Sequence, residues 1–339
     1  MTNRDLVAIG ASRGGFDALR FIVSKIPLDF PASILVTLHL PSNFPSALDK
    51  ILASAGPLRA QFATEGGLLQ KSQIYIAPPE RHLILEGDRL ALGAGPRENF
   101  ARPAIDPMLR SVGLCCGYRA IGVVMTGELM DGASGLADLK ACGGIAVVQD
   151  PADAAYAEMP QQALEAHPDH VSKLFDIPGL LESLVLQPAQ APLPAPQRLK
   201  LEVAIAKEGN ASVDEMDAIG RRSTFVCPEC GGVLWEVEDK DAPSRYRCHV
   251  GHAYHHELLR VALDSNVRVA LGTALRTLSE RLALTQKLQK DAVSRGQRLS
   301  AESWARKVSE LEMEAETIRK AIAVADTLQA QFSASKDPA

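Results

Sequence analysis

The stretch that most constrains this 339-residue chain is Leu6–Gly15, in which a short apolar run passes directly into a turn of small residues, Gly-Ala-Ser-Arg-Gly-Gly. From Phe16 the apolar residues Phe16, Leu19, Ile22 and Val23 recur at helical spacing, so the turn joins a buried strand to an amphipathic helix. One interpretation is a Gly-x-Ser-x-Gly bend that lifts a serine hydroxyl clear of the sheet. The other is a glycine-rich loop whose N–H groups cradle a phosphate.

The first half of the chain alternates short apolar runs with helical patterns. Strands are expected at Val7–Ile9, Ser33–Leu38, Gln73–Ile76, Ala120–Met125 and Gly144–Gln149. Helices are expected at Phe16–Lys25, Ser46–Ala55, Ala104–Gly117, Gly132–Cys142 and Glu158–Ala166. This alternation predicts an α/β fold with a doubly wound, mainly parallel sheet and flanking helices. His82–Glu86 and Arg89–Leu92 are expected to form an attached hairpin, because Gly87-Asp88 lies between them.

A proline-rich segment, Gln187–Gln197, indicates a boundary after this α/β region. We therefore expect an α/β domain over residues 1–186, a Pro-rich linker over 187–222, a small compact module over 223–256, and a helical hairpin or coiled coil over 257–332. The pattern of residues 198–222 is ambiguous, since it fits either an extended segment or a weak helix.

The formal net charge is −5, so the chain lacks the basic footprint of a nucleic-acid-binding protein, and no such partner is expected. No run of about eighteen apolar residues is present, and the N-terminus enters the first strand without the regions of a signal peptide. We therefore expect no membrane insertion and a cytoplasmic location. Three of the six cysteines, Cys115, Cys116 and Cys142, lie in apolar surroundings and are expected to be small buried side chains.

The other three cysteines cluster with histidines in the second half. Cys227-Pro-Glu-Cys230 is followed by two glycines, and a second knuckle, Cys248-His-Val-Gly-His252, follows after seventeen residues. This spacing predicts a zinc ribbon with Cys227, Cys230, Cys248 and His252 as tetrahedral ligands. His249 is the alternative fourth ligand. Because four protein ligands leave no position open for water, the predicted Zn²⁺ is structural.

The C-terminal part is strongly helical from His255 to Asp291, breaks around residues 294–296, and resumes with Ser300 as the expected N-cap. Apolar residues of the second helix alternate spacings of four and three, which is the pattern of a coiled-coil seam. An antiparallel hairpin or a dimerising bundle is predicted, with self-association through these helices as one possible outcome.

The phosphate interpretation of the first turn fails two requirements. Phe16 stands where the nucleotide loop of short-chain dehydrogenases has its third glycine. Those enzymes also need a tyrosine followed four positions later by lysine, and none of Tyr75, Tyr118 and Tyr156 has one. The serine interpretation is therefore favoured.

A serine nucleophile needs a histidine and a carboxylate near the carboxyl ends of the strands. His39 directly follows the strand at Ser33–Leu38, and Asp131 follows the strand at Ala120–Met125. Taken singly, each has an ordinary structural explanation, such as an N-cap for Asp131. Together with Ser12 on one edge of one sheet, they indicate a site.

Residues 6 to about 185 resemble the catalytic domain of the chemotaxis protein-glutamate methylesterases, the CheB family. The blocks that carry the resemblance occur in order along the chain: Ile9–Gly15, Leu38–Pro41, Ile76–Pro79, Arg102–Pro107, Met125–Gly132, and Gln149-Asp150 with Met159-Pro160. The resemblance implies hydrolysis of glutamate γ-methyl esters, or deamidation of glutamine, on a methylated chemoreceptor-like protein, with no cofactor for catalysis. A ribbon-like segment also accompanies some stand-alone proteins of this kind.

By this resemblance Ser12 is the nucleophile, His39 the general base and Asp131 the carboxylate that orients it, with an acyl-enzyme intermediate. The backbone N–H of Arg13 is the expected oxyanion donor. Arg13 and Glu128 depart from the family's pattern, and a Glu128 carboxylate facing a developing oxyanion would be unfavourable. The alternative function is therefore a catalytically weak or inactive scaffold that acts through its ribbon and helices. No receiver domain is expected, because the chain begins at the catalytic strand.

Overall fold

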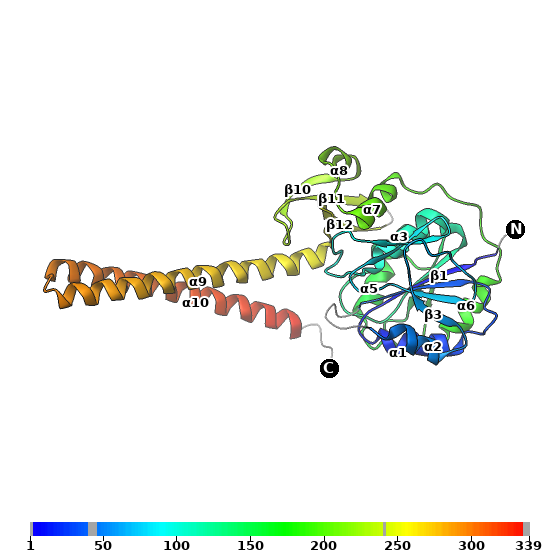
Figure 1. Ribbon diagram of the computed structural model, residues 1–339, viewed down its shortest axis with the longest axis horizontal. Coiled ribbons are helices and arrows are strands. Elements are labelled where there is room, and N and C mark those ends of the chain that lie inside the picture. The colour runs from blue at the N-terminus through cyan, green and yellow to red at the C-terminus, as the bar shows by residue number, and fades with distance from the viewer. Residues whose placement is uncertain (1–2, 40–45, 240–241, 335–339) are drawn as a thin grey trace. The chain divides into compact units, whose positions relative to one another are not determined.

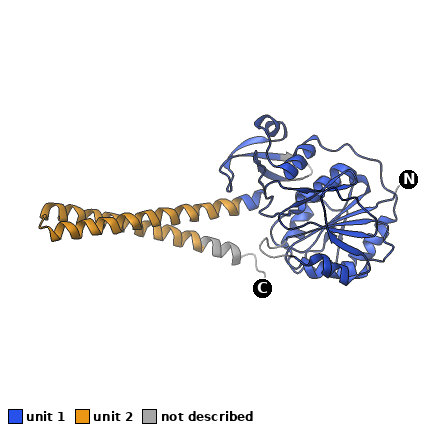
Figure 2. Cartoon of the chain, viewed as in Figure 1, with its two compact units in different colours: residues 1–259 blue, residues 260–339 orange. Residues whose placement is uncertain are grey.

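The computed structural model describes residues 3–39, 46–239 and 242–334. Two residues of the expected His39 block, Leu40 and Pro41, lie outside the described residues. The chain forms two compact units, residues 1–259 and 260–339 (Figure 2). Each unit is described separately below.

A parallel sheet forms the centre of the first unit (Figure 1). It has seven strands in the order β3-β4-β2-β1-β7-β8-β9. Every neighbouring pair in this sheet is parallel. The strands are β1 (Leu6–Ala11), β2 (Ser33–Leu38), β3 (Arg59–Phe62), β4 (Gln73–Ile76), β7 (Ala120–Val124), β8 (Ile145–Gln149) and β9 (His170–Ser172). The predicted parallel α/β sheet is therefore confirmed.

Helices cover both faces of the sheet, because its central strands are apolar on both sides. Val7 and Ile9 of β1 face one core, whereas Leu6 and Ala8 face the other. The first core is covered by α1 (Gly15–Lys25), α2 (Leu48–Ala55) and α6 (Ile177–Val185). The second is covered by α3 (Ile105–Cys116), α4 (Ala133–Ala141) and α5 (Glu158–Ala163), with short 3₁₀ turns at Gly117–Arg119 and Leu164–Ala166.

The predicted hairpin is also present, as β5 (His82–Glu86) and β6 (Arg89–Gly93), and it forms its own two-stranded sheet. The edge strands β3 and β9 were not predicted. Both are short, and neither has a fully buried residue, so they lack the continuous apolar run of the central strands.

The ambiguous stretch after the proline-rich segment is helical, with α7 (Gln197–Glu208) and α8 (Val213–Ile219). It leads into an antiparallel sheet in the order β10-β11-β12-β13, which we call the ribbon sheet. Its strands are β10 (Arg221–Val226), β11 (Val233–Asp239), β12 (Ala242–Cys248) and β13 (Ala253–His255). Helix α7 and the ribbon sheet belong to the same compact unit as the parallel sheet.

The second unit consists of two long helices, α9 (His256–Ser294), whose first turn belongs to the first unit, and α10 (Arg298–Ala334). They run antiparallel, as an ion pair of 2.8 Å between Arg268 and Asp326 shows (Figure 1). The predicted helical pair is confirmed, whereas self-association through it stays a prediction. Ser300 is not the N-cap, since α10 already begins at Arg298, directly after a turn in which Gly296 has a φ of 68°. Among the described residues, no helix is long and apolar enough to span a membrane.

Candidate active site and candidate metal centre

Ser12 lies directly after β1, at the carboxyl edge of the parallel sheet. The chain leaves β1 for β2 on one side, and β7 pairs with β1 on the other, so the strand order reverses at this point. Open α/β sheets bind their ligands at such a reversal. The sharp turn depends on Gly14, whose φ of 74° lies in the left-handed region that disfavours other residues. The Ser12 N–H donates to the carbonyl oxygen of Thr126 at 3.0 Å.

The predicted site residues Ser12, His39 and Asp131 form one hydrogen-bonded chain. His39 Nδ1 lies 3.1 Å from Ser12 Oγ, and His39 Nε2 lies 2.8 Å from Asp131 Oδ2. Asp131 accepts from Nε2, so the proton resides there and the lone pair of Nδ1 faces the serine hydroxyl. His39 follows β2 and Asp131 follows β7, the two strands that flank β1. The arrangement therefore allows His39 to take a proton from Ser12.

Asp131 is buried, with a side-chain exposure of 1%. Burial raises the pKa of its carboxyl, but hydrogen bonds from His39, from the Ile105 N–H and from the Asn99 side chain outweigh burial and hold this pKa below its usual value. Asp131 thus remains ionised beside the imidazole, as a carboxylate that orients histidine must be.

A second buried carboxyl, Asp106, lies next to this site. Its Oδ1 accepts from the N–H groups of Gly132 at 3.1 Å and Gly135 at 2.6 Å, at the start of α4. Burial and the neighbouring Asp131 raise the pKa of Asp106 to about 8. Through its hydrogen bonds with Gly132 and Gly135, Asp106 anchors the loop that carries Asp131 to the following helix.

Arg13 and Glu128, the two residues that depart from the family pattern, contact each other. Arg13 Nη1 lies 2.6 Å from Glu128 Oε1, and the Arg13 guanidinium lies 5.3 Å from the centre of the Tyr156 ring. Both charged side chains are largely exposed, at 58% and 43%. The positive charge of Arg13 and the negative charge of Glu128 thus compensate each other beside Ser12.

Gly127 leaves the space in which Ser12 sits, and Gly10 leaves space for Ile105 of α3. A Cβ on Gly127 would lie 2.8 Å from the Cβ of Ser12 and 2.1 Å from the sulfur of Met159. A Cβ on Gly10 would lie 2.2 Å from a methyl group of Ile105. Real Cβ atoms do not approach other atoms so closely, so larger residues here would displace the serine or α3.

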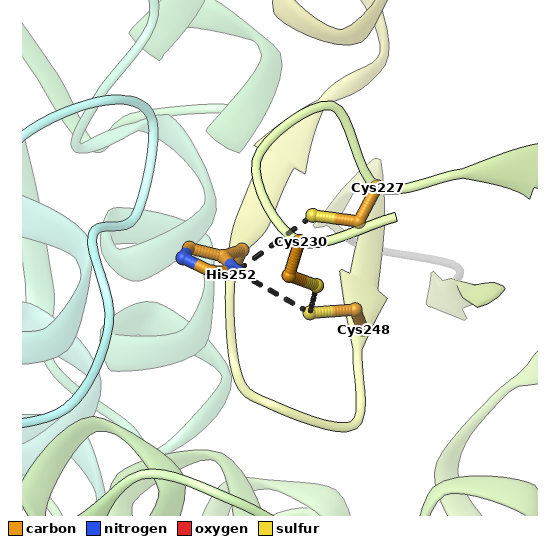
Figure 3. A group of neighbouring side chains, drawn as sticks. All are labelled: Cys227, Cys230, Cys248 and His252. Atoms are coloured by element: carbon orange, nitrogen blue, oxygen red, sulfur yellow. Dashed lines mark hydrogen bonds between the residues drawn. The ribbon is translucent and has the colours of Figure 1, made fainter. Parts of the chain in front are cut away.

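The candidate metal centre lies in the ribbon sheet. Cys227 and Cys230 occupy the turn after β10, Cys248 ends β12, and His252 precedes β13. One ligand atom from each of these four residues lies within 4.8 Å of the others (Figure 3). Among the described residues, His249 does not belong to this group.

Three distances within the group fit a tetrahedral ion. His252 Nδ1 lies 3.7 Å from Cys227 Sγ and 3.6 Å from Cys248 Sγ, and the sulfurs of Cys230 and Cys248 are 3.7 Å apart. A zinc ion with bonds of about 2.3 Å to sulfur and about 2.1 Å to nitrogen separates its ligand atoms by about 3.5 to 3.8 Å. His252 Nε2 lies 3.2 Å from a carboxylate oxygen of Glu229, the kind of outer contact that orients histidine ligands.

Sequence reasoning missed a group of buried charges between α7, the ribbon sheet and the parallel-sheet core. This buried ion cluster consists of Glu98, Arg110, Asp138, Glu202, Arg245 and Arg247. The Glu202 carboxylate lies 2.5 Å from the Arg245 guanidinium. The Glu98 carboxylate lies 2.8 Å from the Arg247 guanidinium. The members come from distant parts of the chain, so no local pattern could have identified them. Asn99, whose side chain contacts Asp131, was missed for the same reason.

A partly exposed serine linked through histidine to a buried carboxylate, at the strand-order reversal of a parallel sheet, is the arrangement of a serine hydrolase. The chain belongs to the CheB methylesterase family, whose sequence profile it matches over residues 7–181. Many curated relatives carry the name protein-glutamate methylesterase/protein-glutamine glutaminase.

Individual relatives give the extent of the similarity. A protein-glutamate methylesterase/protein-glutamine glutaminase of Anaeromyxobacter dehalogenans is 40% identical over 164 residues, which is 48% of this chain and 48% of the relative. The relative of the same name from Pyrococcus abyssi is 36% identical over 180 residues, 52% of this chain and 49% of the relative. A Leptospira interrogans relative is 35% identical over 165 residues, 48% of this chain and 86% of the relative. The chain thus spans about half the length of the first two.

Among solved structures, the Thermotoga maritima CheB methylesterase catalytic domain is similar to this chain. The sequence identity is 30% and the TM-score is 0.51. The match covers all of that domain and 55% of this chain. The second half of the chain, with the ribbon sheet and the two long helices, therefore extends beyond the similarity.

Proposed function

We propose that this protein is a serine esterase that hydrolyses glutamate γ-methyl esters on a methylated chemoreceptor-like protein. The observation that carries the proposal is the hydrogen-bonded chain Ser12–His39–Asp131, with distances of 3.1 and 2.8 Å. Membership of the CheB methylesterase family and the names of the relatives support the substrate class. Glutamine side chains are a second substrate class, since attack on the amide gives the same acyl-enzyme with ammonia as the leaving group.

In the proposed reaction Ser12 Oγ attacks the ester carbonyl while His39 Nδ1 takes the hydroxyl proton. Asp131 holds the Nε2–H and stabilises the imidazolium that forms. The tetrahedral intermediate collapses, the C–O bond to the methoxy group breaks, and His39 returns the proton to give methanol. Water then attacks the acyl-enzyme with His39 again as base, which releases the glutamate carboxylate and restores Ser12.

The N–H of Arg13 is the proposed oxyanion donor. It lies at the turn before α1, directly after the nucleophile, and within the described residues it has no hydrogen-bond acceptor. A preorganised donor of this kind contributes about 3 kcal/mol to stabilising the transition state. The pairing of Glu128 with Arg13 favours an active esterase over the scaffold alternative, because the charge of Glu128 is compensated beside the position where the oxyanion would develop.

The experiment compares wild type, Ser12→Ala and a control variant, Ser24→Ala, whose serine lies exposed on α1. Each protein is incubated with a fluorophosphonate probe and, separately, with a methyl-esterified chemoreceptor fragment. Wild type and Ser24→Ala should label and release methanol, and Ser12→Ala should do neither. Absence of both labelling and methanol release in wild type would exclude the esterase and leave the scaffold function.

We also propose that Cys227, Cys230, Cys248 and His252 bind a structural zinc ion. The distances between their ligand atoms and the contact of Glu229 with His252 support this. With four protein ligands the ion would hold the two knuckles of the ribbon sheet together and take no part in hydrolysis.

Zinc is measured by a chromogenic chelator after thiol modification of the purified protein. Wild type and His249→Ala should release about one equivalent, and His252→Ala should release much less. Zinc far below one equivalent in wild type would contradict the site. Loss of zinc in His249→Ala, with retention in His252→Ala, would identify the other histidine as the ligand.

A further inference from the structure

The loop of residues 98–100 lies between the ribbon sheet and the Ser12–His39–Asp131 chain. Its central residue, Asn99, is buried. The Asn99 Nδ2 donates to Asp131 Oδ1 at 3.1 Å and to Asp106 Oδ2 at 2.9 Å. The amide nitrogen therefore holds the oxygen of Asp131 that is not used by His39.

The other polar groups of Asn99 contact the ribbon sheet. The Asn99 N–H donates to the carbonyl oxygen of Ala253 at 2.8 Å, and Asn99 Oδ1 accepts from the His255 N–H at 3.0 Å. Both partners belong to β13, which begins directly after His252. One side chain thus joins a strand of the ribbon to the carboxylate that orients His39.

Both neighbours of Asn99 also contact the ribbon sheet. Glu98 accepts from Arg247 Nη2 at 2.8 Å, and Arg247 Nη1 donates to the carbonyl oxygen of Gly251 at 3.0 Å. The Phe100 ring meets the Tyr254 ring edge-on, with centres 5.4 Å apart. Every residue of the loop is thus positioned by contacts with the ribbon sheet.

The residue type at position 99 fits this task. Its φ of 50° lies in the left-handed region, which asparagine tolerates better than most residues. The amide supplies one acceptor for His255 and two donors for the carboxylates. Aspartate would lack the donors and would add a negative charge beside the ionised carboxylate of Asp131.

We propose that Asn99 is a positioning residue for Asp131, and that strand β13 fixes Asn99. The ribbon sheet is then part of the apparatus that orients His39 toward Ser12. The kinetic readouts of this inference rest on the proposed esterase function, whereas the spectroscopic readout below does not.

The test uses Asn99→Gly, because glycine keeps the left-handed backbone and the N–H donor to Ala253 while it removes the amide side chain. Asn210→Gly is the matched control. Asn210 also has a positive φ, of 70°, and its N–H also donates to a ribbon carbonyl, that of Val250 at 3.0 Å. Its side chain is exposed, so only the Asn99 substitution removes a contact with Asp131.

The first readout is the low-field proton NMR signal of the His39 Nε2–H, assigned by its loss in His39→Gln. Asn99→Gly should shift or broaden this signal, and Asn210→Gly should leave it unchanged. His252→Ala, directly before β13, should affect it in the same way, whereas His249→Ala should not. These measurements do not require activity.

The second readout is kinetic. Asn99→Gly should lower kcat and the rate of fluorophosphonate labelling by about 10- to 100-fold with little change in KM, because misplacement of the base affects the chemical step. In Asp131→Asn, the further change Asn99→Gly should cost less than threefold, since Asn99 acts through Asp131.

An unchanged His39 signal in Asn99→Gly overturns the positioning role, whether or not the protein is an esterase. An unchanged signal in His252→Ala overturns the dependence on the ribbon sheet. Additive losses in the double variant show that Asn99 acts elsewhere and also overturn the proposal. Absence of labelling in wild type, with the expected NMR shifts, contradicts the esterase function and leaves the positioning role intact.

Discussion

The guanidinium of Arg13 lies 2.6 Å from the carboxylate of Glu128, beside the turn that carries Ser12. The two residues are 115 positions apart in the sequence. Each alone would place an uncompensated charge at the site. As a pair they leave a local charge close to zero, which is the condition under which an oxyanion could form next to Glu128.

Removal of Arg13 alone should therefore be worse than removal of both members of the pair. We expect Arg13→Ala to lower kcat/KM by about three- to tenfold, because the exposed Glu128 carboxylate then acts alone on the developing negative charge. Arg13→Ala with Glu128→Ala should recover most of the loss. Methanol release from a methylated receptor fragment measures the effect, and a double variant as slow as Arg13→Ala would show that the guanidinium contributes in some other way.

Glu202 should be essential for the stability of the first unit. Its side chain is fully buried and contacts Arg245 at 2.5 Å. Glu202→Ala leaves buried guanidinium groups without their carboxylate and should lower the free energy of unfolding by about 3 to 5 kcal/mol. Glu208→Ala, on the exposed side of the same helix, is the control and should change it by less than about 0.5 kcal/mol. Equal urea midpoints for the two variants would contradict the role of the cluster.

The same carboxylate predicts a loss of stability in acid. Burial raises the pKa of Glu202, but the guanidinium groups of Arg245, Arg110 and Arg247 outweigh burial and hold this pKa well below its usual value. The unfolded chain therefore binds the proton more readily. The stabilisation by Glu202 is present above the unfolded pKa of about 4.5 and is lost as the pH falls further.

Urea unfolding of wild type at pH 7, 5, 4 and 3 measures this dependence. Glu202→Gln should be less stable at pH 7 and should show a flatter decline below about pH 4.5, because it has no carboxyl to protonate. Parallel curves for the two proteins would show that other groups cause the acid sensitivity.

Two thiols should be chemically inert in the native protein. Burial raises the pKa of Cys116 to about 12 and that of Cys142 to about 11, so at pH 8 only about one thiol in a thousand or fewer is a thiolate. Iodoacetamide should modify neither in the folded protein and both in urea, as followed by mass spectrometry. Cys230, which is exposed, should react once a chelator has removed the proposed zinc ion. Rapid native alkylation of Cys116 would contradict its burial.

The sequence alone determined the type of the central strands and helices of the α/β region and the sheet edge on which Ser12, His39 and Asp131 lie. Near-continuous apolar runs separated by helices predicted the parallel sheet, since only strands buried on both faces have that pattern. Because the carboxyl ends of parallel strands share one edge, Ser12, His39 and Asp131 could be assigned to the same side before their contacts were known. The spacing of Cys227, Cys230, Cys248 and His252 likewise predicted a compact group, because each knuckle is local in the chain.

Only the tertiary structure decided how these parts meet. The periodicity of apolar residues indicates which residues are buried, but it does not indicate the order of the strands. The placement of β2 and β7 on either side of β1 brings His39 and Asp131 to Ser12. The pairing of Arg13 with Glu128 and the contact of Asn99 with Asp131 join loops that are far apart in sequence. Such long-range contacts leave no local signature, so the link between the ribbon sheet and the serine site became visible only in three dimensions.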